Sequence, residues 1–245
     1  MIIKNLAFII TDTPRAYIYL QILIKNNILP NYFIYLQNHR KKNLPENCKN
    51  KINKFIVPKE YVKICGSTIL TNFDVLNEIK KLDISYDIYK STNIHNSSII
   101  KKIQSRTEKT FIYAGYSGVI LKKNILDTNK NFLHIHGGYL PKYKGSTTNY
   151  YSILEENTIG ASAIFLNQKI DSGKILMSSK FKIPKKKSEI DDFYDSFVRG
   201  ILLLKTIKSY YKNKKWPIKK VDKLNNKNYY IIHPLLKHVA ILSLK

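Results

Sequence analysis

The sequence predicts an α/β protein with a mostly parallel sheet, helices on both faces and a short C-terminal extension. Short apolar runs alternate with amphipathic helical segments along most of the chain, which is typical of a parallel sheet covered on both sides. One long amphipathic segment then ends near residue 211, and the composition changes after Trp216-Pro217. The 245 residues fit either one large domain or a domain with an appendage. We predict a main domain over 1–212 and an extension over 213–245.

The first elements form a βαβ unit. Residues 5–10 are an apolar run and predict a strand, and the four residues at 11–14 supply capping side chains and a first-turn proline. A helix is predicted over 14–25, and a second strand over 32–36. The helix should bury one face made of Ala16, Leu20, Leu23 and Ile24.

Strands and helices continue to alternate after a surface excursion over 37–59, where Asn, Lys and Pro replace any clear period. We predict a helix over 75–82, a strand over 86–89, a helix over 97–104 and a strand over 110–114.

The strand predicted at 131–136 ends at Gly137-Gly138, at the carboxyl edge of the sheet, where open α/β sheets bind their ligands. Ser188 and Asp191 resemble a capping box that starts a helix through about residue 211. The apolar face of that helix should comprise Ile190, Phe193, Phe197, Ile201, Leu204 and Ile207.

The net charge of +25 would fit a polyanionic partner. However, only four of the 42 basic residues are arginines, and nucleic-acid interfaces rely on arginine. We therefore interpret the lysines as a solvated surface and do not expect a nucleic-acid partner.

The chain lacks an apolar run long enough to span a membrane, and its apolar start contains Lys4 and Asn5, so we expect a cytoplasmic protein. Cys48 and Cys65 are too few for a disulfide framework and lack zinc-site spacing, so no metal is expected. Apolar residues near the C-terminus could pack on the body or on a second subunit, which would make a homodimer. They are Tyr229, Tyr230, Ile231, Ile232, Leu235 and Leu236.

Two histidines stand out at the end of the 131–136 strand. His134 and His136 lie two residues apart, so they project from the same face of the strand. Paired imidazoles can be metal ligands, a general base beside a hydrogen-bond donor, or plain polar surface.

Three separated motifs resemble the folate-dependent formyltransferase family, which includes glycinamide ribonucleotide, methionyl-tRNA and sugar N-formyltransferases. They are H-I-H-G-G-Y-L-P-K-Y-K-G-S from His134, G-A-S-A-I-F-L-N-Q-K-I-D-S-G-K-I-L from Gly160, and A-G-Y-S-G-V-I-L from Ala114. The family pattern is N-x-H-x-S-x-L-P followed by I-D-x-G. The resemblance implies a Rossmann-like fold and transfer of a formyl group from 10-formyltetrahydrofolate to an amine.

The resemblance also implies roles for particular residues. His136 would stabilise the tetrahedral oxyanion or relay protons. Asp171 would orient the His136 ring and favour its charged form. It would lie in a tight turn in which Gly173 lets the backbone fold back. The cofactor pocket would comprise Gly115, Tyr116, Ser117, Gly118, Val119, Ile120, Leu121, Leu166 and Ile170. The acceptor would meet Tyr143, Lys144, Gly145 and Ser146, where residues 146–149 could cap a helix.

His134 departs from the family, which has asparagine at this place to donate an amide N–H to the formyl oxygen. An imidazole N–H can donate too, but a changed acyl donor, hydrolysis or a weakened site are open alternatives. Gly137 and Gly138 replace bulkier family residues and should widen the pocket.

The acceptor is inferred by elimination. About 33 residues follow the long helix, too few for the second domain of methionyl-tRNA formyltransferases. The purine-pathway members carry the asparagine that is missing here. An amino sugar linked to a nucleotide is therefore the expected acceptor. The alternatives are a formyltetrahydrofolate hydrolase and a non-catalytic folate- or sugar-binding homologue with a degenerate site.

Overall fold

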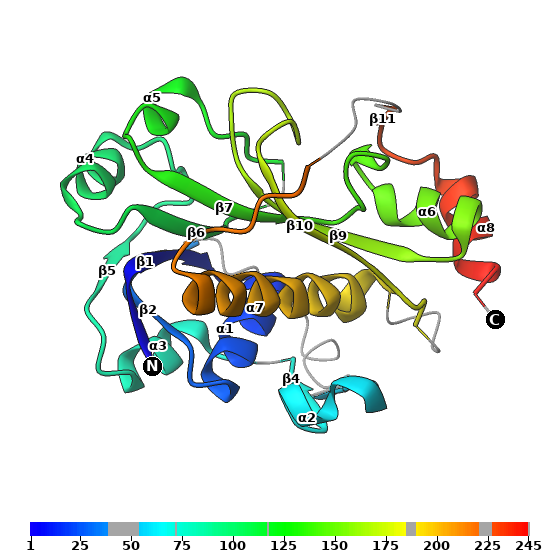
Figure 1. The fold of residues 1–245 in the computed structure, drawn as a ribbon, viewed down its shortest axis with the longest axis horizontal. Helices are drawn as coiled ribbons and strands as arrows, with labels where there is room; N and C mark the ends of the chain where they lie inside the picture. The colour runs from blue at the N-terminus through cyan, green and yellow to red at the C-terminus, as the bar shows by residue number, and fades with distance from the viewer. Residues whose placement is uncertain (39–53, 72, 117, 185–189, 221–226, 245) are drawn as a thin grey trace. The chain divides into compact units, whose positions relative to one another are not determined.

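The structure is a computed structural model that describes residues 1–38, 54–71, 73–116, 118–184, 190–220 and 227–244 (Figure 1). The chain divides into two compact units, Met1–Phe132 (unit 1) and Leu133–Lys245 (unit 2). The division that we predict at 212/213 stays a prediction. Within the described ranges, every helix is too short or too polar to cross a membrane.

Unit 1 contains a parallel sheet in the order β6-β1-β2-β5. Its strands are β1 (Ile2–Thr11), β2 (Leu29–Leu36), β5 (Tyr86–Tyr89) and β6 (Thr110–Ala114), and each pairs in parallel with its neighbours. The central β1 buries Leu6 through Thr11 on both faces, which is why its sequence is a continuous apolar run.

The helices of unit 1 confirm the predicted order. They include α1 (Pro14–Lys25), α3 (Val75–Lys81) and α4 (Ser97–Ser105). The hydroxyl of Thr13 accepts a hydrogen bond from the Ala16 amide at 3.3 Å and so caps α1. Of the face predicted for α1, three residues are buried and Ile24 is only partly covered.

Short elements that the sequence does not reveal lie at the end of the predicted excursion over 37–59 and directly after it. β3 (Lys54–Ile56) pairs antiparallel with β4 (Thr68–Leu70), and α2 (Val62–Cys65) lies between them. These elements, and α5 (Lys123–Leu126), are too short to show a period. Residues 39–53 of the excursion, with Cys48, fall outside the described residues, whereas Cys65, which follows the excursion, is buried.

Unit 2 is built around antiparallel strands. β9 (Ile159–Phe165) pairs with β7 (Asn131–His136) on one side and with β10 (Ile175–Phe181) on the other. The long helix α7 (Asp195–Asn213) packs on β9 and β10 (Figure 1). With the parallel strands of unit 1, this gives the mostly parallel α/β architecture that the sequence predicts.

The start of the long helix differs from the prediction. A π-helical turn over Ile190–Tyr194 precedes the regular α7, and the proposed capping residue Ser188 lies outside the described residues. The apolar stripe is otherwise buried, with Phe193 half-exposed. A period of 3.6 residues cannot distinguish one wide turn from an α-helical one.

The C-terminal segment packs on the rest of unit 2. β11 (Asn228–Tyr229) pairs with β8 (Lys144–Gly145), and α8 (Pro234–Leu242) lies against α6 (Thr148–Glu156) (Figure 1). The six predicted apolar residues differ in exposure. Ile232 is buried and Tyr229 is half-buried, whereas Leu236 is 48% exposed and Tyr230, Ile231 and Leu235 are 70–80% exposed.

Glu156 ties the loop after β7 to β10. Its carboxylate accepts bonds from Lys142 at 2.5 Å and Lys180 at 2.6 Å, and these lysines lower the pKa of Glu156 from 4.5 to about 2. A depressed carboxyl pKa stabilises the fold above the unfolded value and loses that effect as the pH falls through the folded value. The variant Glu156→Gln should lose about 1 kcal/mol or less at pH 7, because the lysines are nearly half exposed.

That loss should shrink as the pH falls from 4.5 toward 2. Urea denaturation of both proteins across this range measures it. A loss that is constant with pH would mean that Glu156 acts by packing.

Candidate active site

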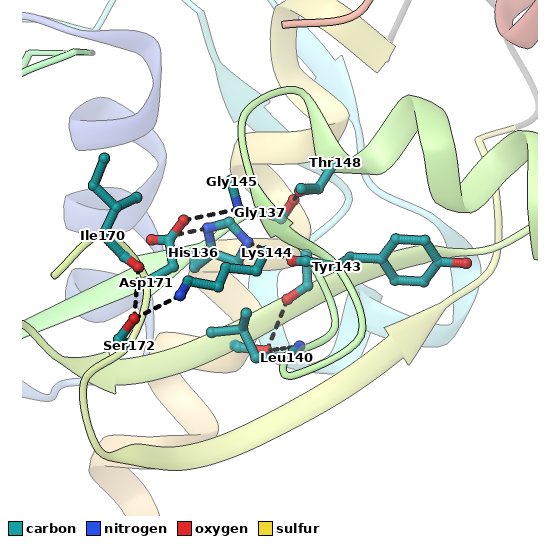
Figure 2. A network of polar contacts seen from close by, with 12 residues as sticks. His136, Gly137, Leu140, Tyr143, Lys144, Gly145, Thr148, Ile170, Asp171 and Ser172 are labelled. Carbon is teal, nitrogen blue, oxygen red and sulfur yellow. Dashed lines mark hydrogen bonds and ion pairs between the residues drawn. The ribbon is translucent and has the colours of Figure 1, made fainter. Parts of the chain in front are cut away.

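His136 is the last residue of β7 and its side chain is buried. Its Nδ1 atom lies 3.4 Å from Oδ1 of Asp171, and its Nε2 atom lies 2.9 Å from the carbonyl oxygen of Tyr143 (Figure 2). The structure therefore brings together the two residues that the sequence selects, and it adds a main-chain acceptor on the far side of the ring.

The protonation of His136 reflects opposing influences. Burial lowers the pKa of His136 below its ordinary value, and the charge of Arg199 acts in the same direction. Asp171, the Tyr143 carbonyl and Asp195 favour the imidazolium and oppose that shift. A neutral ring can donate to only one of its two neighbouring acceptors, whereas the imidazolium satisfies both. The pair is thus arranged to change its proton content when its surroundings change.

Asp171 is held by its turn and by β8. Its other carboxylate oxygen, Oδ2, accepts a hydrogen bond from the Gly145 amide at 3.1 Å (Figure 2). Lys144 donates to the Ser172 hydroxyl at 2.6 Å, which ties the same two segments together. The left-handed residue of the turn is Asp171 itself, with φ +47°. Gly173 is needed for another reason, because a Cβ there would lie 1.6 Å from the Phe165 carbonyl oxygen.

Gly137 and Gly138 do not widen the pocket as the sequence suggests. A Cβ on Gly137 would lie 2.1 Å from Nη2 of Arg199, and one on Gly138 would lie 2.7 Å from Nε2 of His136. The guanidinium and the imidazole already occupy the space that larger side chains would take. Both glycines therefore permit close packing.

Arg199 belongs to a polar network, and it lies outside the sequence motifs described above. It pairs with Asp195 at 2.6 Å, and Asp195 accepts a hydrogen bond from the Asn149 side chain at 2.5 Å. Asn149 in turn accepts from the Gly160 amide at 3.0 Å. The i, i+4 spacing of Asp195 and Arg199 on a helix is a signal that could have identified the pair. Its proximity to Gly137 could not have been found that way.

The hydroxyls expected to cap α6 serve other contacts. Thr148 donates to the Gly137 carbonyl, and Thr147 accepts from the Ile232 amide at 2.9 Å. The cap residue Thr147 is itself left-handed. Nearby, the Ser162 hydroxyl donates to the Gly138 carbonyl at 2.7 Å and accepts from the Leu140 amide at 2.8 Å, which fixes the turn after β7.

Comparison with known proteins identifies the family. The formyl transferase family model matches residues 4–198, which is most of the chain. The chain belongs to the formyl transferase family. A methionyl-tRNA formyltransferase of Finegoldia magna is 28% identical over 106 residues, which cover 42% of this chain and 34% of that protein. The match thus spans about a third of the length of such curated relatives.

Solved structures show the same formyltransferase fold. An N-formyltransferase from Helicobacter canadensis, in complex with folinic acid and dTDP-3-aminofucose, has a TM-score of 0.57 at 16% identity, covering 93% of this chain and 71% of that one. A phosphoribosylglycinamide formyltransferase from Anaplasma phagocytophilum has a TM-score of 0.55 at 12% identity, covering 93% and 98%. The predicted fold class is therefore confirmed.

His134 lies on β7, two residues before His136. It sits opposite Ile164 in the ladder with β9, and His136 sits opposite Ser162. Strand alternation places both imidazoles on the same side of β7. His134 is half-buried, whereas His136 is buried. A direct role for His134 stays a prediction.

The residues predicted to meet the acceptor are close to this pair but differ in exposure. Tyr143 is fully buried, and its hydroxyl donates to Glu155 at 3.0 Å, so its carbonyl is what reaches His136. Lys144 and Gly145 are half-exposed, and Ser146 is exposed. Their contact with an acceptor stays a prediction.

The residues predicted to line the cofactor pocket lie in both units. In unit 1, Arg15 donates to the Gly115 carbonyl at 2.5 Å, and the Ile120 carbonyl lies 3.0 Å from Nε2 of His95. Gly118 has φ +78° and open space beside it, Ile120 is 53% exposed, and Ser117 lies outside the described residues. Leu166 and Ile170 belong to unit 2, half-exposed and exposed respectively. Their common role in a pocket stays a prediction.

Proposed function

We propose that the chain is an N-formyltransferase that moves a formyl group from 10-formyltetrahydrofolate to the amine of a nucleotide-linked amino sugar. The observation that carries this proposal is the pairing of the buried His136 with Asp171 within a formyl transferase fold. Formyl transfer to an amine passes through a tetrahedral oxyanion and requires removal of a proton from that amine. A histidine paired with a carboxylate suits both requirements.

The residues would divide this work. Asp171 favours the imidazolium of His136, and an imidazolium can donate an N–H to a developing oxyanion. In the structure Nε2 faces the Tyr143 carbonyl, so this N–H would exchange that acceptor for the formyl oxygen. His134 would supply a second N–H from the same side of β7. When the oxyanion collapses, the bond between the formyl carbon and N10 of the folate would break, and His136 would pass its proton to N10. The neutral ring would then accept the proton that the amine loses, which restores the imidazolium.

The donor proposal rests on the family and on unit 1. The Helicobacter canadensis neighbour was solved with folinic acid, a formylated folate. Residues 115–121 offer an open glycine and an exposed isoleucine, which suit a flat ring system against a backbone loop.

The acceptor has two candidates, each favoured by a different relative. The same neighbour contains dTDP-3-aminofucose, which supports a nucleotide-linked amino sugar. The curated relatives are methionyl-tRNA formyltransferases, which supports methionyl-tRNA as the second candidate. Only four basic residues are arginines, and this favours the sugar.

Calorimetric titration with 5-formyltetrahydrofolate should show saturable binding. This compound keeps the pterin and benzoyl groups of the donor, and its formyl group is not transferred. Folded protein that binds none up to millimolar ligand would contradict the donor proposal. With 10-formyltetrahydrofolate and dTDP-3-aminofucose, mass spectrometry should detect an N-formyl sugar. Methionyl-tRNA should give no product.

Two other outcomes would identify the alternatives. Formate released without a formylated amine would indicate a hydrolase. Folate binding without turnover of any tested acceptor would indicate a binding protein. A homodimer also stays a prediction, and light scattering over a range of protein concentrations tests it.

A further inference from the structure

The C-terminal strand β11 lies directly on the segment that contacts His136 and Asp171. Asn228 pairs with Lys144 and Tyr229 with Gly145, and the Ser146 amide donates to the Tyr229 carbonyl at 2.9 Å. The contact continues beyond the strand, because Thr147 accepts from the Ile232 amide at 2.9 Å. The segment 144–147 is therefore lined by a part of the chain that lies outside the family match at 4–198.

The side chain of Tyr229 anchors β11 to α6. Its ring centroid lies 4.6 Å from that of Tyr151 and 5.5 Å from that of Tyr143. Its hydroxyl donates to one oxygen of Glu155 at 2.9 Å, and the Tyr143 hydroxyl donates to the other at 3.0 Å. One carboxylate thus joins the C-terminal strand to the loop that follows β7.

Gly145 is the point where β11 and the active-site pair meet. Its φ of +109° and a Cβ position only 2.1 Å from the Tyr229 carbonyl oxygen mean that only glycine fits there. The amide of the same residue donates to Asp171, whose other oxygen faces His136 (Figure 2). Two residues earlier, the Tyr143 carbonyl lies against the far side of the imidazole. Segment 143–145 therefore contacts both members of the pair.

We propose that β11, through Tyr229, positions Asp171 against His136. The strand fixes Gly145, and the Gly145 amide fixes the carboxylate. Asp171 needs such support because it lies in a left-handed turn that is half-exposed. Tyr229 is a positioning residue in this account, because it acts through Gly145. The inference rests on the proposed function only for its kinetic readout.

The variant Tyr229→Ala removes the anchor and leaves the pair intact. If Asp171 is then held less closely, His136 loses the carboxylate that favours its imidazolium, so its pKa should fall further. The charged and polar groups around this ring are Asp171, Arg199, Asp195 and the Tyr143 carbonyl, and His134 lies on the same side of β7. Nitrogen-detected NMR titration of the ring, assigned with His136→Gln, measures the shift without any substrate.

The kinetic readout is kcat with 10-formyltetrahydrofolate and dTDP-3-aminofucose, which should fall about tenfold, since small displacements of a catalytic pair cost one to two orders of magnitude. Binding of 5-formyltetrahydrofolate should be unchanged. The control Tyr230→Ala removes the neighbouring, 80% exposed side chain and should alter neither readout.

A folded Tyr229→Ala protein with the wild-type His136 titration would overturn the inference, whether or not the wild type transfers formyl groups. If Tyr229→Ala does not fold, Tyr229→Phe keeps the ring and loses only the bond to Glu155. It should then lower the His136 pKa by a smaller amount, and an unchanged titration there overturns the proposal as well. If the wild type shows no turnover but the His136 pKa still shifts as expected in the Tyr229 variants, only the proposed function would be rejected.

Discussion

Replacing His136 with alanine, or Asp171 with alanine, is expected to lower kcat at least about a hundredfold, the usual scale for acid–base groups and oxyanion donors. His136 is buried with both ring nitrogens beside acceptors, so the variant removes the donor and its partner contacts together. Asp171→Ala leaves the imidazole without the carboxylate that favours its charged form. Steady-state rates with saturating donor and acceptor measure both effects.

The two variants should differ in how activity depends on pH. Without Asp171 the imidazolium is less favoured, so the His136 pKa falls. Because the imidazolium is the proposed donor, the alkaline limb of the kcat profile moves to lower pH. The exposed histidine of α8 supplies a control, and His238→Ala should keep wild-type rates. Near-normal turnover in a folded His136→Ala or Asp171→Ala protein would place the chemistry elsewhere.

Several strands of this protein could be predicted from local sequence patterns, whereas contacts between residues far apart in the chain could not. Residues 86–89 and 110–114 were predicted with their correct bounds, because each strand is a short run between clear breaks. The His136–Asp171 pair was selected because both residues lie in motifs. Neither their separation of 3.4 Å nor the Tyr143 carbonyl across the ring is encoded in any local pattern.

Long-range contacts explain what the sequence did not reveal. Arg199 fills the space beside Gly137 from a helix 62 positions further along the chain, so the glycine was misread as an opening. Tyr229 reaches Gly145 from 84 positions away, and no motif includes Tyr229. Such packing depends on the tertiary arrangement, and periodicity carries no information about it.

His134 gives the second large effect, because it stands where the family has asparagine. If its ring acts as a neutral N–H donor to the formyl oxygen, His134→Asn should retain much of the activity, since an amide supplies the same donor at a similar reach. His134→Ala should lower kcat by about a hundredfold, the cost of removing one oxyanion donor. Both rates are measured with saturating 10-formyltetrahydrofolate and dTDP-3-aminofucose.

The pH profile separates donation from proton transfer. Two imidazoles on one side of β7 repel when both are charged, so they should titrate as a coupled pair whose macroscopic values belong to neither residue alone. His134→Asn should therefore simplify the acidic limb while preserving the rate. If His134→Asn is as inactive as His134→Ala, with both folded and binding 5-formyltetrahydrofolate, then His134 must transfer protons or contact a different acyl donor, because its N–H alone would have been replaced. If His134→Ala is fully active, the half-buried ring is a structural residue at the end of a strand, and His136 and Asp171 are sufficient for the chemistry.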